Sequence, residues 1–314
     1  MKIVMAGGTG MVGTALRRYL AREADVVILS KRPGNVKWDA ATLGDWAAEL
    51  EGADVVINLA GKSINCRYTT ENMTELTHSR IASTRVIGQA IAAAKNPPKL
   101  WLQASAASIY AHRYDAPNDE EHGLIGGTEP NLPPKWKAIV GLVKAWEAEL
   151  DNAKTPSTRK IAMRSTIVMS PDKGGPFEHF AKAAKWGVGG RVGTGKQYVS
   201  WIHEEDFANA VWFLMEQEEI SGPVNMTAPS PLPNWEFMED VREAFGTRIG
   251  LPVPRWLLEP TMALMKSESE LLLKSRRVIP GKLLNAGFEF KYETWGKACN
   301  ELMKRWKATH TGLS

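Results

Sequence analysis

The sequence predicts an α/β protein in which a doubly wound parallel sheet is followed by a smaller C-terminal lobe. In the first half of the chain, short apolar runs alternate with amphipathic segments, and a glycine cluster follows the first run. From about residue 171 the pattern changes to segments interrupted by glycine and proline. Apolar strands separated by helices are typical of a parallel sheet that is covered on both faces. We expect residues 1–170 to form the sheet domain, with residues 200–225 contributing, and residues 171–314 to form the smaller lobe.

The individual elements follow from the spacing of apolar residues, which is continuous in buried strands and helical in amphipathic helices. The expected strands are 2–6, 26–29, 54–59 and 100–105, and a further apolar run covers 161–169. The expected helices are 12–23, 43–50, 70–94 and 136–150, with an acidic-to-basic helical stretch at 259–277.

Composition excludes several classes of protein. The chain has 314 residues, of which 44% are hydrophobic and 24% charged, so it can form a sizeable core and is not disordered. A net charge of +4 is too mild to indicate a nucleic-acid or membrane-surface partner. The two cysteines, Cys66 and Cys299, lie outside any CxxC pattern and favour a reducing compartment. With no long apolar stretch and glycines from the seventh residue, neither a membrane span nor a signal peptide is expected, and the predicted location is cytoplasmic.

A glycine-rich loop connects the first predicted strand to the first predicted helix. It reads Gly7-Gly8-Thr9-Gly10-Met11-Val12-Gly13, with the spacing GxxGxxG. Glycines at such a turn let the backbone approach a pyrophosphate, and the N-terminus of the following helix offers free N–H groups to the phosphates. In a series of βα units this loop predicts a dinucleotide site.

The end of the second predicted strand indicates which dinucleotide is bound. Proteins that select NAD usually carry Asp or Glu there, which binds the ribose 2′-hydroxyl. This chain has Ser30-Lys31-Arg32 instead, and the first acid is Asp39. A hydroxyl and two cations suit a 2′-phosphate, so NADP is the predicted cofactor. The alternative is a solvated basic turn.

Two other patterns are weaker. The stretch 190–196 matches GxxxxGK, but Gln197 replaces the Ser or Thr that would bind magnesium, and no strongly apolar strand precedes it. The carboxylates of 115–121 resemble a metal cluster, but they lack an EF-hand pattern, and the chain has no HExxH. We therefore expect neither a nucleotide triphosphatase nor a metal site.

Several strings resemble a known family. The glycine loop, NLAG at 58–61 and ASAASIY ending at Tyr110 resemble the extended short-chain dehydrogenases/reductases. More narrowly, the chain resembles the atypical epimerase-family branch that carries a DUF1731 segment, expected here at about 249–296. The supporting strings are SRIASTR at 79–85, SWIH at 200–203, GPVNMTAP at 222–229, LPVP at 251–254 and RVIP at 277–280.

This resemblance implies a Rossmann domain that binds NADP and a smaller lobe that binds a small-molecule substrate of the nucleotide-sugar type. We expect a monomer or a homodimer. The resemblance assigns residues to the cofactor as follows: Gly7, Gly10 and Gly13 to the pyrophosphate, Ser30, Lys31 and Arg32 to the adenosine phosphate, Asp39 to the adenine pocket, and Leu59, Ala60 and Gly61 to the segment beneath the adenosine ribose.

The family's catalytic pattern is incomplete in this chain. These enzymes use a serine or threonine together with a YxxxK pair on one helix. The alignment places Ile139 and Val143 at the Tyr and Lys positions, and Lys144 lies about 100° around the helix from the Lys position. The usual serine position falls on Ala106, between Ser105 and Ser108.

Other groups near the same strand end are candidates for catalysis. Ser105, Ser108 and Tyr110 are expected at the carboxyl end of a strand, where open α/β sheets bind ligands. Each also has a purely structural interpretation, as a local hydrogen-bond partner or a packing residue. His203 is interpreted as a buried histidine or one that serves a helix start, and Arg164 as the partner of a carboxylate.

Two hypotheses for function follow. In the first, the protein is an NADP(H)-dependent oxidoreductase or a nucleotide-sugar-epimerase-like enzyme, with Ser105 or Tyr110 as the proton donor. In the second, it is a redox-silent NADP(H)-binding protein that senses the cofactor or binds a partner. The missing Tyr and Lys favour the second hypothesis, whereas the glycine loop and the second lobe fit both.

Overall fold

The computed structural model describes residues 1–32, 36–264 and 266–310 and contains the predicted parallel sheet. Its seven strands are arranged in the order β10-β6-β5-β4-β1-β2-β3, and each neighbouring pair is parallel. The strands are β1 (Lys2–Ala6), β2 (Asp25–Ser30), β3 (Val36–Lys37), β4 (Val55–Asn58), β5 (Leu100–Ala106), β6 (Arg159–Ser165) and β10 (Gly222–Met226). The chain order reverses between β1 and β4, which opens a crevice at their carboxyl ends.

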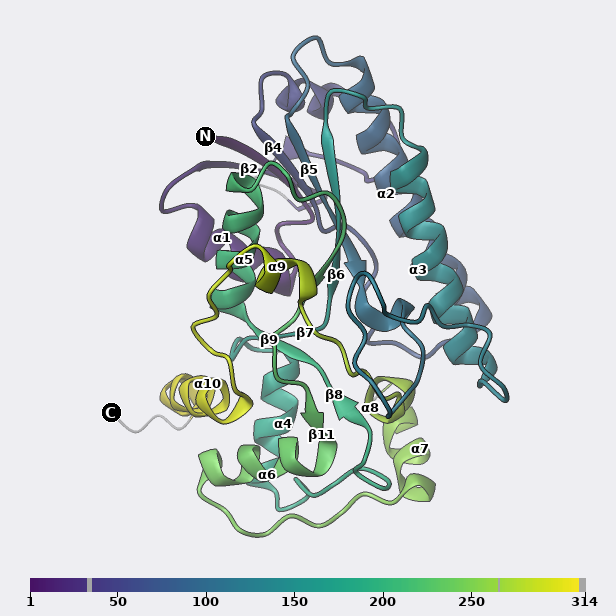
Figure 1. Cartoon of the computed structure of the whole chain (residues 1–314), viewed down its shortest axis with the longest axis vertical. Coiled ribbons are helices and arrows are strands. Elements are labelled where there is room, and N and C mark those ends of the chain that lie inside the picture. Colours follow the sequence, from purple (N-terminus) through teal and green to yellow (C-terminus); the bar gives the residue numbers. More distant parts are fainter. Residues whose placement is uncertain (33–35, 265, 311–314) are drawn as a thin grey trace.

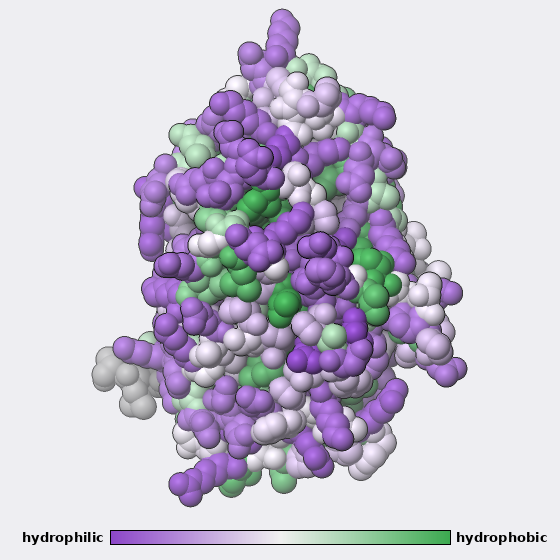
Figure 2. Space-filling model, viewed as in Figure 1, coloured by the Kyte–Doolittle hydropathy of each residue, from purple (hydrophilic) through white to green (hydrophobic). Residues whose placement is uncertain are grey.

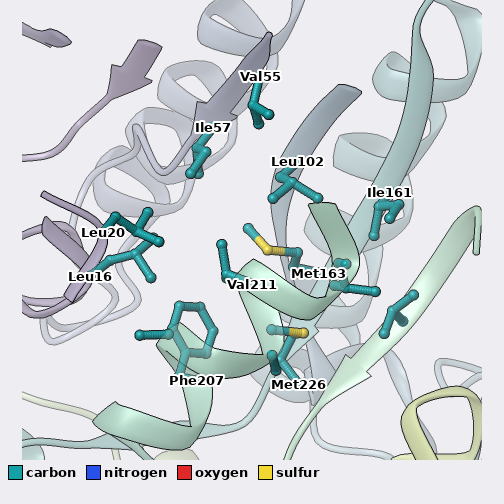
Figure 3. Packing of buried hydrophobic residues seen from close by; sticks show 14 of the residues in the cluster. Leu16, Leu20, Val55, Ile57, Leu102, Ile161, Met163, Phe207, Val211 and Met226 are labelled. Carbon is teal, nitrogen blue, oxygen red and sulfur yellow. The ribbon is translucent and has the colours of Figure 1, made fainter. Parts of the chain in front are cut away.

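Helices cover both faces of the sheet, as expected for buried parallel strands. On one face lie α1 (Met11–Leu20) and α5 (Glu204–Glu216), and on the other lie α2 (Thr70–Ala93), α3 (Pro134–Asn152) and the 3₁₀ turn η1 (Asp45–Leu50) (Figure 1). Figure 3 shows Leu16 of α1 and Phe207 and Val211 of α5 packing toward strand residues such as Ile57 and Met163. All five of these side chains are buried.

The smaller lobe is built from short strands and helices. Two small pairs occur, parallel β7 (Ile167–Met169) with β9 (Trp201–His203) and antiparallel β8 (Tyr198–Val199) with β11 (Leu232–Pro233). The helices are α4 (Pro176–Lys185), α6 (Asn234–Phe245), α7 (Arg255–Leu264), α8 (Glu270–Leu273), α9 (Gly281–Asn285) and α10 (Trp295–His310). We propose a sheet domain of residues 1–170 with 200–225, to which the chain returns where Leu283, Phe288 and Phe290 join the sheet core.

The predicted helix over 259–277 is wrong. Helix α7 ends at Leu264, and the rest of the described part of this stretch contains the single turn of α8 as its one helix. Between them, the buried Glu268 carboxylate accepts hydrogen bonds from Tyr68 N (2.7 Å) and Lys135 Nζ (2.9 Å), so this segment bonds to other parts of the fold. After α8 the chain is extended, and Arg276 N donates to the carbonyl of Tyr198 in β8 (2.9 Å). Tertiary hydrogen bonds thus override the helical pattern.

Two other sequence interpretations can be compared with the structure. The apolar run at 161–169 divides into β6 and β7, which belong to different sheets. The GxxxxGK stretch at 190–196 is a loop that leads into β8, so the helix that a phosphate-binding loop requires does not follow it.

Buried polar groups connect the two lobes beside α1, the helix that follows the glycine loop. His203 Nδ1 accepts from Glu205 N (3.1 Å) at the start of α5, and its Nε2 lies 2.8 Å from Glu301 of α10. The adjacent Glu204 carboxylate is buried and binds both Arg18 of α1 (2.8 Å) and Arg305 of α10. The structural interpretation of His203 is therefore confirmed.

The outer surface is mixed in character. Figure 2 shows that polar residues dominate the face seen in Figure 1, with apolar residues in separate small patches. Among the described residues, no helix is both long enough and apolar enough to cross a membrane.

The aromatic core of the smaller lobe yields a stability prediction. Trp295 is 2% exposed, stacks on Phe237 with ring centroids 4.1 Å apart, and donates from Nε1 to the Phe237 carbonyl. Trp295→Ala should lower the free energy of unfolding by about 3–5 kcal/mol, because it leaves a large cavity. The control is Trp256→Ala, since Trp256 is 77% exposed, and its effect should stay within about 0.5 kcal/mol. Urea unfolding of both variants measures the difference, and equal losses would contradict this account of the lobe.

Candidate cofactor and substrate site

The glycine loop is closely packed on one side and open on the other. Gly7 has a φ of +76°, and a Cβ there would lie 2.8 Å from Ala60 N. A Cβ on Gly13 would lie 2.5 Å from Gly8 Cα, so both positions require glycine. At Gly10 the nearest atom to an added Cβ is the Gly7 carbonyl oxygen, at 3.5 Å. Gly10 is the N-cap residue of α1, and no side chain caps this helix. The open side of the loop therefore presents backbone N–H groups to an anion.

The end of β2 lies beside this loop. Thr9 Oγ1 and Ser30 Oγ are 3.2 Å apart, and Ser30 Oγ accepts from Arg32 N (3.0 Å). The side chains of Lys31 and Arg32 are exposed, and neither forms an ion pair with a carboxylate in the part of the chain that the structure describes. Two cations and a hydroxyl next to an open glycine loop fit the 2′-phosphate of NADP.

Asp39 stands at the same edge of the sheet but uses its oxygens locally. Its carboxylate accepts from Ala41 N, Thr42 N and Thr42 Oγ1, and these bonds lower the pKa of Asp39 to about 2. The preceding residue, Trp38, donates from its backbone N to the Ser30 carbonyl (3.2 Å). Asp39 is therefore near the adenosine end of the expected site, as a turn-forming residue, and its place in an adenine pocket stays a prediction.

The loop after β4 forms the other wall of the crevice. Leu59 N donates to the Ala6 carbonyl (2.9 Å), which holds this loop beside the end of β1. The buried Asn58 accepts from Ala60 N (3.0 Å) and donates to Gln103 Oε1 of β5 (3.0 Å). Gly61 follows and is exposed. The structure thus brings Leu59, Ala60 and Gly61 next to the glycine loop.

A buried ion pair organises the carboxyl end of β5. Glu147 of α3 binds Arg164 of β6 through two hydrogen bonds, from Nε (2.9 Å) and Nη2 (2.8 Å). Ser105 Oγ donates to the same carboxylate (2.5 Å), and Ser105 is 6% exposed. The expected carboxylate partner of Arg164 is confirmed, and the Ser105 hydroxyl is held by it.

Tyr110 belongs to the same network. Its hydroxyl donates to Asn225 Oδ1 of β10 (2.9 Å) and accepts from Arg164 Nη1 (3.0 Å). The side chain is 2% exposed, and burial raises the pKa of Tyr110. A buried tyrosine with both hydrogen-bonding functions in use joins β6 to β10 and has no free direction toward a ligand.

Ser108 differs from the other two candidates. It lies half-buried in the 3₁₀ turn η2 (Ala107–Ile109), and its hydroxyl has no hydrogen-bond partner among the described residues. Its carbonyl oxygen accepts from Lys274 Nζ (2.8 Å). Sequence reasoning missed Lys274, because it lies within the stretch assigned to a helix. The KSRR run at 274–277 was the available signal, but only the folded chain places it at β5.

Helix α3 carries no replacement for the missing pair. Ile139 and Val143 are 5% and 2% exposed and pack in an apolar cluster with Tyr68 and Ala107. Lys144 donates to the Gly126 carbonyl (2.8 Å), so it supports the loop after β5. In the part of the chain that the structure describes, no group of three His, Cys, Asp or Glu side chains could hold a metal ion.

Comparisons with known proteins agree with this architecture. Residues 3–133 match the NAD dependent epimerase/dehydratase family, and residues 253–302 match the domain of unknown function DUF1731. The human epimerase family protein SDR39U1 is 31% identical over 311 residues, which cover 96% of this chain and 100% of the relative. The epimerase family protein YfhF of Bacillus subtilis is also 31% identical over 311 residues, covering 96% and 98%.

Solved structures extend the comparison to the fold and the cofactor. The crystal structure of human SDR39U1 (isoform 2) with NADPH has a TM-score of 0.85 and 30% identity, and the match covers 97% of this chain and 99% of that one. The UDP-N-acetylglucosamine 4-epimerase of Bacillus cereus has a TM-score of 0.75 at 19% identity, covering 98% and 99%, which shows a shared fold alone. The expected cofactor is thus the one with which a relative was crystallised. The chain belongs to the NAD-dependent epimerase/dehydratase family, among the epimerase family proteins that carry a DUF1731 segment.

Proposed function

We propose that the protein is an NADP(H)-dependent oxidoreductase that acts on a carbonyl or alcohol group of a small polar substrate. The observation that carries this proposal is the basic, acid-free end of β2 beside an open glycine loop. The NADPH found with the 30% identical human relative supports it. Bound NADPH would supply a hydride, and the protein would supply binding, orientation and a polar partner for the substrate oxygen.

Different residues of the crevice bind different parts of the cofactor. The N–H groups at the start of α1 face the pyrophosphate across Gly10, while Lys31 and Arg32 bind the adenosine phosphate. Because the strand order reverses at β1 and β4, the adenosine half extends over β2 and the other half extends toward β5. The substrate then lies near the carboxyl end of β5, between the sheet and the smaller lobe.

We assign different roles to the three candidate catalytic residues. Ser108, in the turn after β5, has a hydroxyl without a hydrogen-bond partner among the described residues and is our candidate for a hydrogen bond to the substrate oxygen. Ser105 and Tyr110 are positioning residues, because the Glu147–Arg164 pair holds both of their hydroxyl groups. They keep the turn that carries Ser108 in place against β6 and β10.

A second candidate function is a redox-silent NADP(H)-binding protein. The specific observation in its favour is the apolar character of Ile139 and Val143, both buried where the family's Tyr and Lys are expected. A screen of carbonyl compounds and nucleotide sugars for NADPH oxidation separates the two candidates. Turnover supports the oxidoreductase, whereas tight NADPH binding without turnover across the panel supports the sensor.

The first prediction from this site concerns Gly10. Gly10→Val should abolish NADPH binding, because the side chain would occupy the open side of the loop, where the pyrophosphate approaches. The fold should persist, since the nearest contact at that position is 3.5 Å away. The matched control is Gly141→Val, because an added Cβ at Gly141 meets nothing within 4 Å. Tryptophan quenching by NADPH that survives in Gly10→Val would show that the loop has another role.

A second prediction concerns the choice between NADPH and NADH. The parent should bind NADPH at least tenfold more tightly than NADH, a difference of about 1.4 kcal/mol. Arg32→Ala should remove most of that preference, because a guanidinium can bind the 2′-phosphate through two hydrogen bonds. Arg22→Ala is the control, since Arg22 lies beyond the far end of α1. Calorimetric titrations of the parent and of both variants with both cofactors give the six affinities, and equal binding of NADPH and NADH by the parent would refute the assignment.

A third prediction separates the roles of Tyr110 and Ser108. Tyr110→Phe should lower the free energy of unfolding by about 1–3 kcal/mol, because it removes the hydroxyl that Asn225 Oδ1 and Arg164 Nη1 both contact and leaves these two atoms without that hydrogen bond. Tyr114→Phe is the control, since Tyr114 is 46% exposed. Ser108→Ala should leave stability unchanged but reduce turnover on any active substrate by roughly 10²-fold. A fully active Ser108→Ala variant would remove Ser108 from the site.

A further inference from the structure

Two segments of the smaller lobe lie side by side and together form a surface that we call the lobe tip. They are residues 185–196, which begin at the end of α4, and residues 246–258, which lead from α6 into the first turn of α7. Leu251 N donates to the Gly187 carbonyl (2.8 Å), so the two segments are joined directly. Figure 1 shows the light green chain between α6 and α7 at the lower end of the molecule. The lobe tip therefore lies at that end.

Large apolar side chains of the lobe tip are exposed to solvent. They are Trp186, Val188, Ile249, Leu251, Trp256 and Leu257, and the two tryptophans are 71% and 77% exposed. Both segments contribute to one patch, because Ile249 Cγ2 lies 3.5 Å from the position that a Cβ on Gly187 would take. Exposed apolar residues that occur singly are ordinary, whereas a group of them marks an interaction surface.

Helix α7 does not need its exposed side chains in order to pack against the lobe. Its buried residues are Leu258 and Met262, which form a small apolar cluster with Val192 of the lobe tip. Trp256 precedes Leu258 by two residues, so it lies about 200° around the helix from this packed face. An outward tryptophan on a helix that is already packed on its inner side is available to a partner.

The charged residues of the lobe tip are all positive. They are Lys185, Arg191, Lys196, Arg248 and Arg255, and each is exposed. Neither segment contains an Asp or Glu, and none of these cations forms an ion pair with any residue that the structure describes. The net charge of +4 is a sum over the whole chain and conceals this local excess of positive charge. An anionic surface is therefore the complementary partner.

We propose that the lobe tip docks on the surface of a membrane that contains anionic phospholipid. The cores of protein–protein interfaces are depleted of charged residues, but here cations alternate with apolar side chains along both segments. A membrane surface accepts both kinds of side chain at once. Aromatic and aliphatic groups enter the headgroup region, where tryptophan is favoured, and the cations bind the lipid phosphates.

This docking does not depend on the proposed function. The glycine loop and the end of β2 belong to the sheet domain and share no residue with the lobe tip. The affinity for NADPH should therefore be the same in the parent and in every variant described below. A change in membrane binding can thus be separated from a change in the cofactor site.

The experiment is flotation of the full chain with two kinds of vesicle, phosphatidylcholine alone and phosphatidylcholine mixed with phosphatidylglycerol. The parent should bind the anionic vesicles at least about tenfold more strongly than the neutral ones, because several cations meet the negative surface together. This preference should be lost at about 1 M salt, where the Debye length is only about 3 Å.

Charge reversal tests the cations. Arg248→Glu combined with Arg255→Glu should weaken binding to the anionic vesicles by at least about tenfold, since each cation near such a surface contributes roughly fivefold. Lys95→Glu combined with Lys99→Glu is the matched control. These two lysines are exposed, lie before the amino end of β5, and give the same change in net charge. The control variant should bind as the parent does.

Removal of the tryptophans tests the apolar contribution. Trp186→Ser combined with Trp256→Ser should weaken vesicle binding by at least about tenfold, because both side chains would otherwise enter the headgroup region. The matched control is Leu43→Ser combined with Leu124→Ser, since these exposed leucines lie outside the lobe tip. Urea unfolding of each variant should match that of the parent, because all the substituted side chains are exposed.

Several results would overturn the inference. A parent that binds neutral and anionic vesicles equally, or binds neither, contradicts it, and so do lobe-tip variants that bind as the parent does. A dimeric parent that becomes monomeric in the tryptophan variant, as measured by light scattering, would assign the lobe tip to contact with a second copy instead. If a lobe-tip variant does not fold, the vesicle preference and the salt dependence of the parent still decide the question.

Discussion

The ion pair between Glu147 and Arg164 determines the shape of the site's edge. It joins α3 to β6, and both of its side chains are largely buried. Glu147 accepts from the Ser105 hydroxyl of β5, and Arg164 donates to the Tyr110 hydroxyl. Tyr110 in turn donates to Asn225 of β10. Removing either charge would leave the other largely buried without an opposite charge, which is strongly unfavourable. Three adjacent strands and one helix therefore depend on a single charged contact.

The C-terminal segment completes this edge from the other side. Asn118 exchanges backbone hydrogen bonds with Arg277 and Ile279, and Glu120 accepts from Asn225 N (2.7 Å) and Lys282 N (3.2 Å). The loop after β5 is thus held between the sheet and residues of the DUF1731 segment. This arrangement brings Lys274, from late in the chain, to the turn after β5, whereas helix α3 has the apolar Ile139 and Val143 at the positions of the family's Tyr and Lys. The smaller lobe therefore contacts the turn and the loop that follow β5.

The ion pairs that join the two lobes near α1 also hold the helix at the cofactor crevice. Glu204 at the start of α5 binds Arg18 of α1 and Arg305 of α10, so α1 is linked to α10 through this carboxylate. Arg18 also contacts Asp172, close to the first residues of the smaller lobe (2.6 Å). The helix whose N-terminus faces the open side of the glycine loop is therefore held from its other end by both lobes.

The sheet and the cofactor crevice could be predicted from the sequence alone. Continuous apolar runs such as 2–6 and 100–105 have one stable environment, a sheet covered on both faces, and the GxxGxxG spacing reflects local steric needs at Gly7 and Gly13. The absence of an acid after β2 is likewise a local property of the chain. These features depend on neighbouring residues, which the sequence records directly.

The polar contacts at the carboxyl end of β5 were decided by the tertiary structure. The sequence names Ser105, Ser108 and Tyr110 as candidates and prefers Ser105 or Tyr110 as proton donor. Contacts with Glu147, Arg164 and Asn225 occupy the hydroxyls of these two, whereas that of Ser108 has no partner among the described residues. Lys274 lies in a run with a helical pattern. Glu268 accepts hydrogen bonds from Tyr68 and Lys135, Arg276 N donates to the Tyr198 carbonyl, and these bonds replace the helix and place the lysine beside the turn after β5. The hydrogen bonds of the segment 268–276 with Tyr68, Lys135 and Tyr198 join residues more than 75 positions apart. Local sequence patterns do not determine which distant residue becomes the hydrogen-bond partner, because that depends on how the two lobes pack.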